Sequence, residues 1–310
     1  MTRQQAGLSL VMPRFAVSRG AVGLALIILA PRTAWAQGLE RDPAAHARFL
    51  ALNVAIGATA SVARAVASGA PIRVALAKGL LGGSLMSAGM ELIGTESRAA
   101  RFAGLQLTAV GASVARNVDA GAPLLSDVTL PIYPFYVRVQ PQAPHPVTAR
   151  LSVMSTARLV TVMTSGSRPR VDWRETLVTG APILRSPQWR LPSSSCPPPC
   201  GGSFAQHNAG LVIYSASAGT DYDLQRTLAH ESVHLAQQTR DAVLAAIPAS
   251  DAAFERLGPG GRTVSRFLVV DVVMPFRFID EGELRMRGGP RRSSWFETEA
   301  RAFAPGGEIR

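Results

Sequence analysis

The sequence predicts an α+β fold, in which a helical region rich in alanine and glycine precedes a domain with a small β-sheet. Three observations carry this prediction. Residues 47–122 are dominated by small side chains at helical spacing, and from Leu125 onwards short segments alternate apolar and polar residues, as half-buried strands do. Between Asp221 and Arg240 neither proline nor glycine interrupts the chain, so this segment is expected to be the main helix of the second domain.

The amino-terminal segment, residues 1–36, has the layout of a secretory signal peptide. Arginines without any acid surround an apolar core at 21–30 that is too short to span a bilayer. Ala34 and Ala36 then supply a small-residue cleavage site. We therefore expect an exported protein, periplasmic or secreted, after cleavage near Ala36. An uncleaved membrane anchor is the alternative.

The chain is basic, with a formal net charge of +11. Residues 1–36 contain four arginines and no acid, so cleavage reduces this charge to +7. The remaining arginines are scattered, without a dense patch or interleaved aromatic residues, and nucleic-acid binding is not predicted. A basic exported protein can still contact anionic lipid or cell-wall polymer.

The helical region, residues 37–124, carries small side chains every four positions. Gly57 and Ser61 belong to one such stripe, and Gly79 and Gly83 belong to another. Stripes of this kind let helix backbones approach closely, so we expect a bundle of about three helices.

Two interpretations of this region remain. It either contacts a membrane or envelope surface through its helices, or it forms a compact helical subdomain. Charged residues interrupt every apolar run well short of a membrane span, which favours the compact subdomain. No oligomeric state is predicted.

The second domain, residues 125–310, begins with strands. Residues 135–139 and 149–153 alternate apolar and polar side chains, and the proline-rich loop 140–146 joins them. Asp271 is an odd polar member of a later apolar segment and a candidate partner of a functional site. The remaining elements expected here are helices at 156–163 and 172–178, strands at 183–185 and 209–215, helices between 241 and 257, and a strand at 267–274.

Both cysteines, Cys196 and Cys200, lie in a loop rich in proline, serine and glycine. An exported protein favours a disulfide between them. The three prolines that separate them would hold the two Cα atoms roughly 12 Å apart in an extended polyproline path. A disulfide needs a separation of about 4.4–6.8 Å, so the bond that we expect requires a turn or a cis proline in this loop.

The segment His230-Glu231-Ser232-Val233-His234 has the pattern H-E-x-x-H. Residues four apart on a helix lie on one face, so both histidines can direct an imidazole at a single metal ion. Glu231 then lies beside the metal, where it can take a proton from a zinc-activated water. The alternative is a buried helix that carries these residues without a metal.

This pattern resembles the zincin metallopeptidases, and HESVHLAQQ is similar to bacterial domains with the sequence H-E-x-x-H-x-x-Q-Q. The resemblance covers the chain from Asn208 to the carboxyl end. It implies a zincin-like domain at 125–310, Zn²⁺ as the cofactor and a peptide or protein as the substrate. It also implies that the strand at 209–215 is the sheet edge that pairs with an extended substrate.

A catalytic zinc ion needs a third protein ligand. In metzincins this would be a histidine six residues after His234, but Arg240 stands there and excludes that branch. No other histidine follows, so we expect a carboxylate. The candidates are Asp271, Asp280, Glu281, Glu283, Glu297 and Glu299.

The segment from Glu297 to Arg301 is similar to the E-x-x-A-D segment of gluzincins. The resemblance implies that Glu297 is the zinc ligand and Ala300 the small residue that lets two helices pack, with Arg301 in place of the usual aspartate. Helical periodicity keeps an alternative open. Residues two apart point about 200° from each other, and Glu299 lies nearer the apolar side of this segment.

The function expected from these residues is that of an exported zinc metallopeptidase-like hydrolase with Glu231 as general base. Tyr214, Tyr222 and His207 are candidates to stabilise the oxyanion. The alternative is a non-catalytic, envelope-associated structural or assembly protein with a structural or absent metal.

Overall fold

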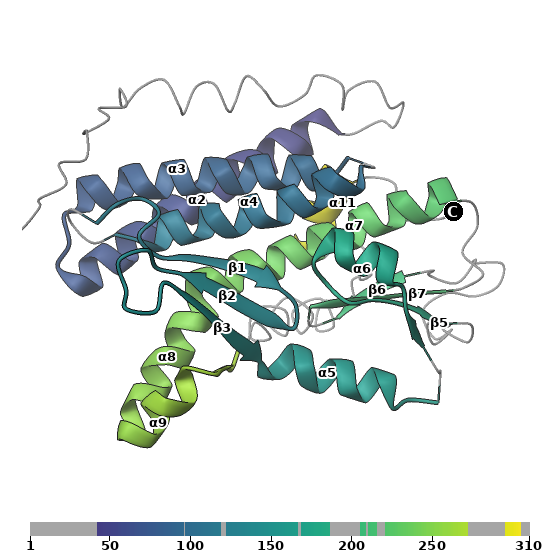
Figure 1. The fold of residues 1–310 in the computed structure, drawn as a ribbon. Helices are drawn as coiled ribbons and strands as arrows, with labels where there is room; N and C mark the ends of the chain where they lie inside the picture. The colour runs from purple at the N-terminus through teal and green to yellow at the C-terminus, as the bar shows by residue number, and fades with distance from the viewer. Residues whose placement is uncertain are drawn as a thin grey trace, which may run out of the picture.

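The computed structural model describes residues 42–95, 97–118, 122–166, 169–186, 205–208, 210–215, 221–271 and 295–304. These residues form a mixed α+β fold (Figure 1). The predicted signal peptide, the two cysteines and the candidate ligands Asp280, Glu281 and Glu283 lie outside the described residues.

Three long helices form one layer of the molecule (Figure 1). They are α2 (Pro43–Ser68), α3 (Ile72–Ile93) and α4 (Arg98–Arg116). The side chain of Asp42 caps the first, and Gly69 ends it in the left-handed conformation. The predicted set of about three helices is confirmed.

Small residues allow these helices to touch at their backbones. A Cβ atom added to Gly57 would lie 2.5 Å from the carbonyl oxygen of Gly79, and one added to Gly82 would lie 2.5 Å from that of Gly111. Only glycine fits at such approaches. The predicted role of the small residues in close helix packing is confirmed.

Among the described helices, α2 is long and apolar enough to cross a membrane by length and composition, a test that core helices also pass. Its inward face packs within the protein. Asn53 and Ser61 are fully buried, and Ser61 donates a hydrogen bond to the carbonyl oxygen of Ala115 on α4.

Two small sheets lie on the other side of the molecule. The first has the order β1-β2-β3-β8, with antiparallel pairs except for β3 and β8. Its strands are β1 (Val128–Ile132), β2 (Phe135–Val139), β3 (Val147–Ser152) and β8 (Leu268–Val269). The predicted strands at 135–139 and 149–153 are confirmed apart from the last residue of the second. Ser152 accepts a hydrogen bond from the amide of Ser155 and so begins helix α5 (Val153–Met163) earlier than expected.

The second sheet has the order β4-β5-β7-β6. Its strands are β4 (Arg170–Val171), β5 (Ile183–Ser186), β6 (Ala205–Asn208) and β7 (Leu211–Ser215), and helix α6 (Trp173–Thr179) joins the first two. The strand expected to be the substrate-pairing edge is β7. That expectation is wrong, because β5 and β6 pair with both sides of β7 and leave no backbone edge for a substrate.

Helix α7 (Asp221–Asp241) runs between the three-helix layer and the sheets (Figure 1). A π-helical turn (Ala242–Ala246) continues it into α8 (Ile247–Arg256), which α9 (Gly258–Ser265) follows. The short helix α11 (Trp295–Phe303) contacts α7 and α2.

One buried apolar cluster contains residues of every layer, including Met86 of α3, Val212 of β7, Val233 of α7 and Phe303 of α11. The segments on either side of the predicted boundary at residue 124 therefore share one core.

Candidate metal centre

Helix α7 presents two histidines from one face. His230 and His234 lie one turn apart, and their rings meet nearly at right angles with centroids 5.1 Å apart. Both side chains are buried. Leu228, Val233 and Leu235 belong to the apolar core, so the packing that holds α7 in place also fixes the direction of the two imidazoles.

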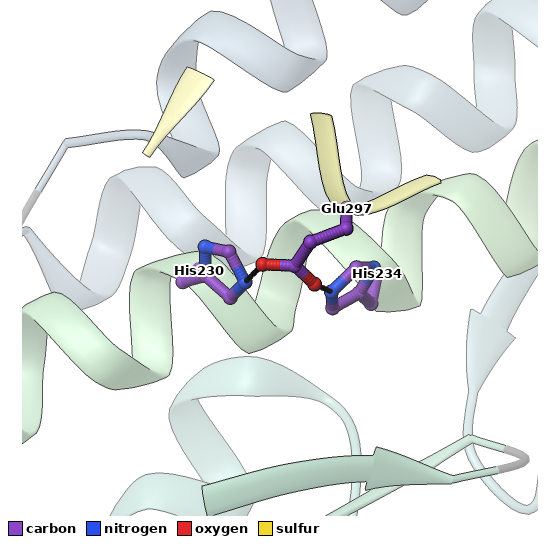
Figure 2. Close-up of side chains that lie close together, drawn as sticks. All are labelled: His230, His234 and Glu297. Atoms are coloured by element: carbon purple, nitrogen blue, oxygen red, sulfur yellow. Dashed lines mark ion pairs between the residues drawn. The ribbon is translucent and has the colours of Figure 1, made fainter. Parts of the chain in front are cut away.

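Glu297 of α11 completes the group. Figure 2 shows its carboxylate between the two imidazoles, with one oxygen facing each ring. Oε1 lies 3.2 Å from Nε2 of His230, and Oε2 lies 3.4 Å from Nε2 of His234. One ligand atom from each of the three residues falls within 4.8 Å of the others, so the group could hold a metal ion.

Hydrogen bonds assign the tautomer of each histidine. Nδ1 of His230 lies 3.2 Å from the carbonyl oxygen of Ala304, and Nδ1 of His234 lies 2.8 Å from Oε1 of Gln237. Both partners can only accept, so each Nδ1 carries the hydrogen. Each Nε2 faces Glu297. In the neutral ring, with its hydrogen on Nδ1, the lone pair of Nε2 is available to a metal.

The electrostatics of the group favour a bound cation. Burial opposes charge on His230, but the hydrogen bond to Glu297 and the charges of Glu231 and Glu297 raise its pKa above the ordinary value. Burial also opposes ionisation of Glu297, yet hydrogen bonds and charge from the two histidines hold its pKa well below the usual range. Both shifts show that the site stabilises positive charge beside an ionised carboxylate, and a metal ion can supply that charge.

Two further residues lie beside the group. Arg301, one turn after Glu297, donates from Nε to Oε1 of that carboxylate at 3.2 Å. Glu231 directly follows His230 on α7, and its side chain is buried. The predicted catalytic carboxylate therefore lies on the same helix as the two candidate histidine ligands and next to His230 in the sequence.

The alternative ligand Glu299 does not meet the histidines. It is fully buried, forms an ion pair with Nη1 of Arg240 at 2.9 Å and accepts a hydrogen bond from Asn53 at 2.8 Å. Burial would lower the pKa of Arg240, but Glu299 and Asp241 raise it overall, so this arginine stays charged. The periodicity argument placed Glu299 inside correctly, but its interior partner is an arginine.

Two other residues that the sequence suggested, Tyr214 and Asp271, have hydrogen-bond partners in other parts of the fold. The hydroxyl of Tyr214 donates to Oδ2 of Asp172 at 2.7 Å, at the start of α6. Asp271 accepts hydrogen bonds from Tyr136 and Ser152 in the first sheet. The side chains of Tyr222 and His207 lie outside the described part of the structure.

Sequence reasoning missed Gln237 and the carbonyl of Ala304. Gln237 lies three residues after His234, a spacing that brings two side chains together on one helix, so the sequence contained a usable signal. The Ala304 carbonyl gave none, because its position depends on how α11 packs against α7.

Comparison with family models, with curated proteins and with solved structures gives no match for this chain.

Proposed function

We propose that this protein is an exported, zinc-dependent hydrolase of the metallopeptidase type. The observation that supports it best is the convergence of two Nε2 atoms from α7 and the Glu297 carboxylate from α11. Two histidines and one glutamate are a ligand set of catalytic zinc, with a fourth position left for water or substrate.

The donor atoms lie close enough together for a single metal ion, because one ligand atom from each of the three residues lies within 4.8 Å of the others. Imidazole nitrogen and carboxylate oxygen are donors that zinc takes in catalytic sites. The nearest nitrogen–oxygen separations, 3.2 Å for His230 and 3.4 Å for His234, involve the two different oxygens of Glu297. The side chain of Glu297 also keeps 25% of its surface exposed, so the group is open to solvent on one side. A structural zinc site is usually closed by a fourth protein ligand.

A zinc ion held by these residues would supply Lewis acidity and lower the pKa of its water towards neutrality. Glu231 would accept a proton from the attacking water at its carboxylate and donate that proton to the leaving amine. The water oxygen joins the carbonyl carbon and the C–N bond breaks. His230 and His234 keep their Nδ1 hydrogens throughout, because the Ala304 carbonyl oxygen and Oε1 of Gln237 accept hydrogen bonds from these two atoms.

The test is metal content by elemental mass spectrometry, on protein beginning at Gln37 and purified without a histidine tag. Wild-type protein should contain about one zinc per chain, the minimum for a catalytic site. His234→Ala should lose it, and Glu231→Gln should keep it but lose cleavage of a mixed peptide library. Folded wild-type protein that takes up no zinc after zinc is added back would overturn the proposal. Zinc binding without peptide cleavage by wild-type protein would favour the non-catalytic, structural alternative, and equal cleavage by Glu231→Gln would exclude Glu231 as the base.

A further inference from the structure

Every polar atom of the Gln237 side chain has a partner. Its Oε1 accepts from Nδ1 of His234 at 2.8 Å. Its Nε2 donates to the carbonyl oxygen of Phe296 at 2.9 Å and to Oε2 of Glu299 at 3.0 Å. Both acceptors are on α11, so the amide group has one orientation available, and that orientation turns its oxygen to His234. Gln237 is 1% exposed, so water does not compete for these bonds.

Glu299, the anchor of this amide, is itself held from two other helices. Arg240 of α7 donates to both of its oxygens, at 2.9 and 3.3 Å, and Asn53 of α2 donates to Oε1 at 2.8 Å. Arg240 also donates to Oδ1 of Asn53 at 2.8 Å. Asn53, Arg240 and Glu299 are each 0% exposed. This buried network connects α2, α7 and α11 and ends on the ring of His234.

We propose that Gln237 is a positioning residue of the metal centre, and that it sets zinc affinity through His234. By accepting from Nδ1 it fixes the tautomer in which Nε2 carries the lone pair, and it fixes the rotation of the ring. Such partners of ligating histidines determine ligand orientation and basicity. This inference rests on the proposed zinc function. It extends that function to Glu299, which holds the amide of Gln237, and to Asn53 and Arg240, which hold Glu299.

The test compares Gln237→Met with Gln238→Met. Methionine keeps the length of the side chain and lacks the amide, and Gln238 is the matched control because it is the next residue on α7 and is also buried. Zinc affinity is measured by competition with a chromogenic chelator, and the geometry of the site by the visible absorption of bound Co²⁺. Gln237→Met should bind zinc about 10–100-fold more weakly and shift the Co²⁺ bands, as loss of a ligand's outer partner typically does. Gln238→Met should match wild type in both.

A double variant, Gln237→Glu with Glu299→Gln, keeps the result decisive if the methionine variant does not fold. It exchanges the two groups, so the carboxylate at position 237 still accepts from His234 while the amide at position 299 donates to that carboxylate. The Phe296 carbonyl loses its donor in this variant, as it also does in Gln237→Met. The net charge of the network is unchanged. This variant should bind zinc more tightly than Gln237→Met, or within tenfold of wild type if Gln237→Met is unfolded.

Two results would overturn the inference while leaving the zinc site standing. One is wild-type affinity in a folded Gln237→Met, and the other is an equal loss of affinity in folded Gln237→Met and the double variant. Absence of zinc from wild type itself would instead remove the proposed function, and this inference with it.

Discussion

Changing Glu297 or Glu299 of α11 to glutamine should have different effects, one on zinc content and the other on stability. Glu299→Gln removes the negative partner of Arg240, whose side chain is 1% exposed. Removing one partner of a buried ion pair costs about 3–5 kcal/mol of unfolding free energy. Asp241 also pairs with Arg240, at 3.0 Å, so we expect a loss of about 3 kcal/mol, at the lower end of that range. With an unfolding entropy of about 2.1 cal/mol/K per residue, a chain of this length loses about 5 °C of melting temperature.

Glu297→Gln should show the opposite pattern. It removes the carboxylate that faces both imidazoles, and a neutral amide is not among the usual ligands of zinc. Zinc content should therefore fall, while the melting temperature of the metal-free protein changes less than in Glu299→Gln, because the Glu297 side chain is partly exposed.

The assay pairs thermal unfolding by circular dichroism with zinc content at saturating zinc, for both variants and for wild type. Glu299→Gln should melt early but keep its zinc at saturation. The assignment of the two roles would be refuted if Glu299→Gln lost zinc with an unchanged melting temperature and Glu297→Gln kept it.

Three further predictions follow from separate parts of the molecule. Gly83→Ala should lower the free energy of unfolding by about 1–3 kcal/mol in urea, because its Cβ would lie 2.5 Å from Cα of Val54, whereas Gly260→Ala, with nothing within 4 Å, should not. Glu231→Gln should slow peptide hydrolysis by about 10²–10⁴-fold with zinc content unchanged, and equal rates would contradict its role as base. Burial opposes ionisation of Asp127, but neighbouring arginines outweigh it and lower its pKa. Its stabilising contribution is therefore present above the unfolded value of about 3.9 and is lost as the pH falls through the folded value. The difference in unfolding free energy between wild type and Asp127→Asn should shrink below about pH 4, and a constant difference would exclude this linkage.

The spacing of apolar, polar and small residues correctly predicted several helices and strands. The stripe through Gly57 and the stripe through Gly83 implied helices in backbone contact, and those contacts are present. The alternation at 135–139 implied a strand with two faces, and β2 occupies that range. The uninterrupted segment from residue 221 implied a long helix, and α7 occupies it. In each case the spacing of residues within one element carried enough information.

What the sequence could not supply was the partner of each element. The strand 209–215 has the apolar character of a buried strand, and this agrees equally with an edge and with an interior place. Its place was decided by the pairing with β6, which no pattern within the strand encodes. Periodicity likewise placed Glu299 on the buried side of its helix. It could not say that the partner there is Arg240, fifty-nine residues earlier in the chain.

The position of the third candidate ligand explains why the amino-terminal helices matter to the candidate metal centre. Helix α11 has nine residues, and an isolated helix of that length is not stable in water. It must therefore be held by its neighbours. His46 of α2 contacts the carbonyl oxygen of Ala302 at 3.1 Å and the ring of Phe303 at a centroid distance of 5.4 Å.

Asn53, two turns further along α2, holds Glu299 from the same helix. Two contacts from α2 thus fix both the end and the middle of α11, and Glu297 lies between Trp295 and Glu299 on that short element. Its carboxylate reaches the histidines of α7 only while α11 stays in this place. A chain beginning at residue 125 would retain His230, Glu231 and His234 but would lose the surface that positions Glu297. The helical region is therefore needed to assemble the candidate metal centre, although it contributes no candidate ligand among the residues described.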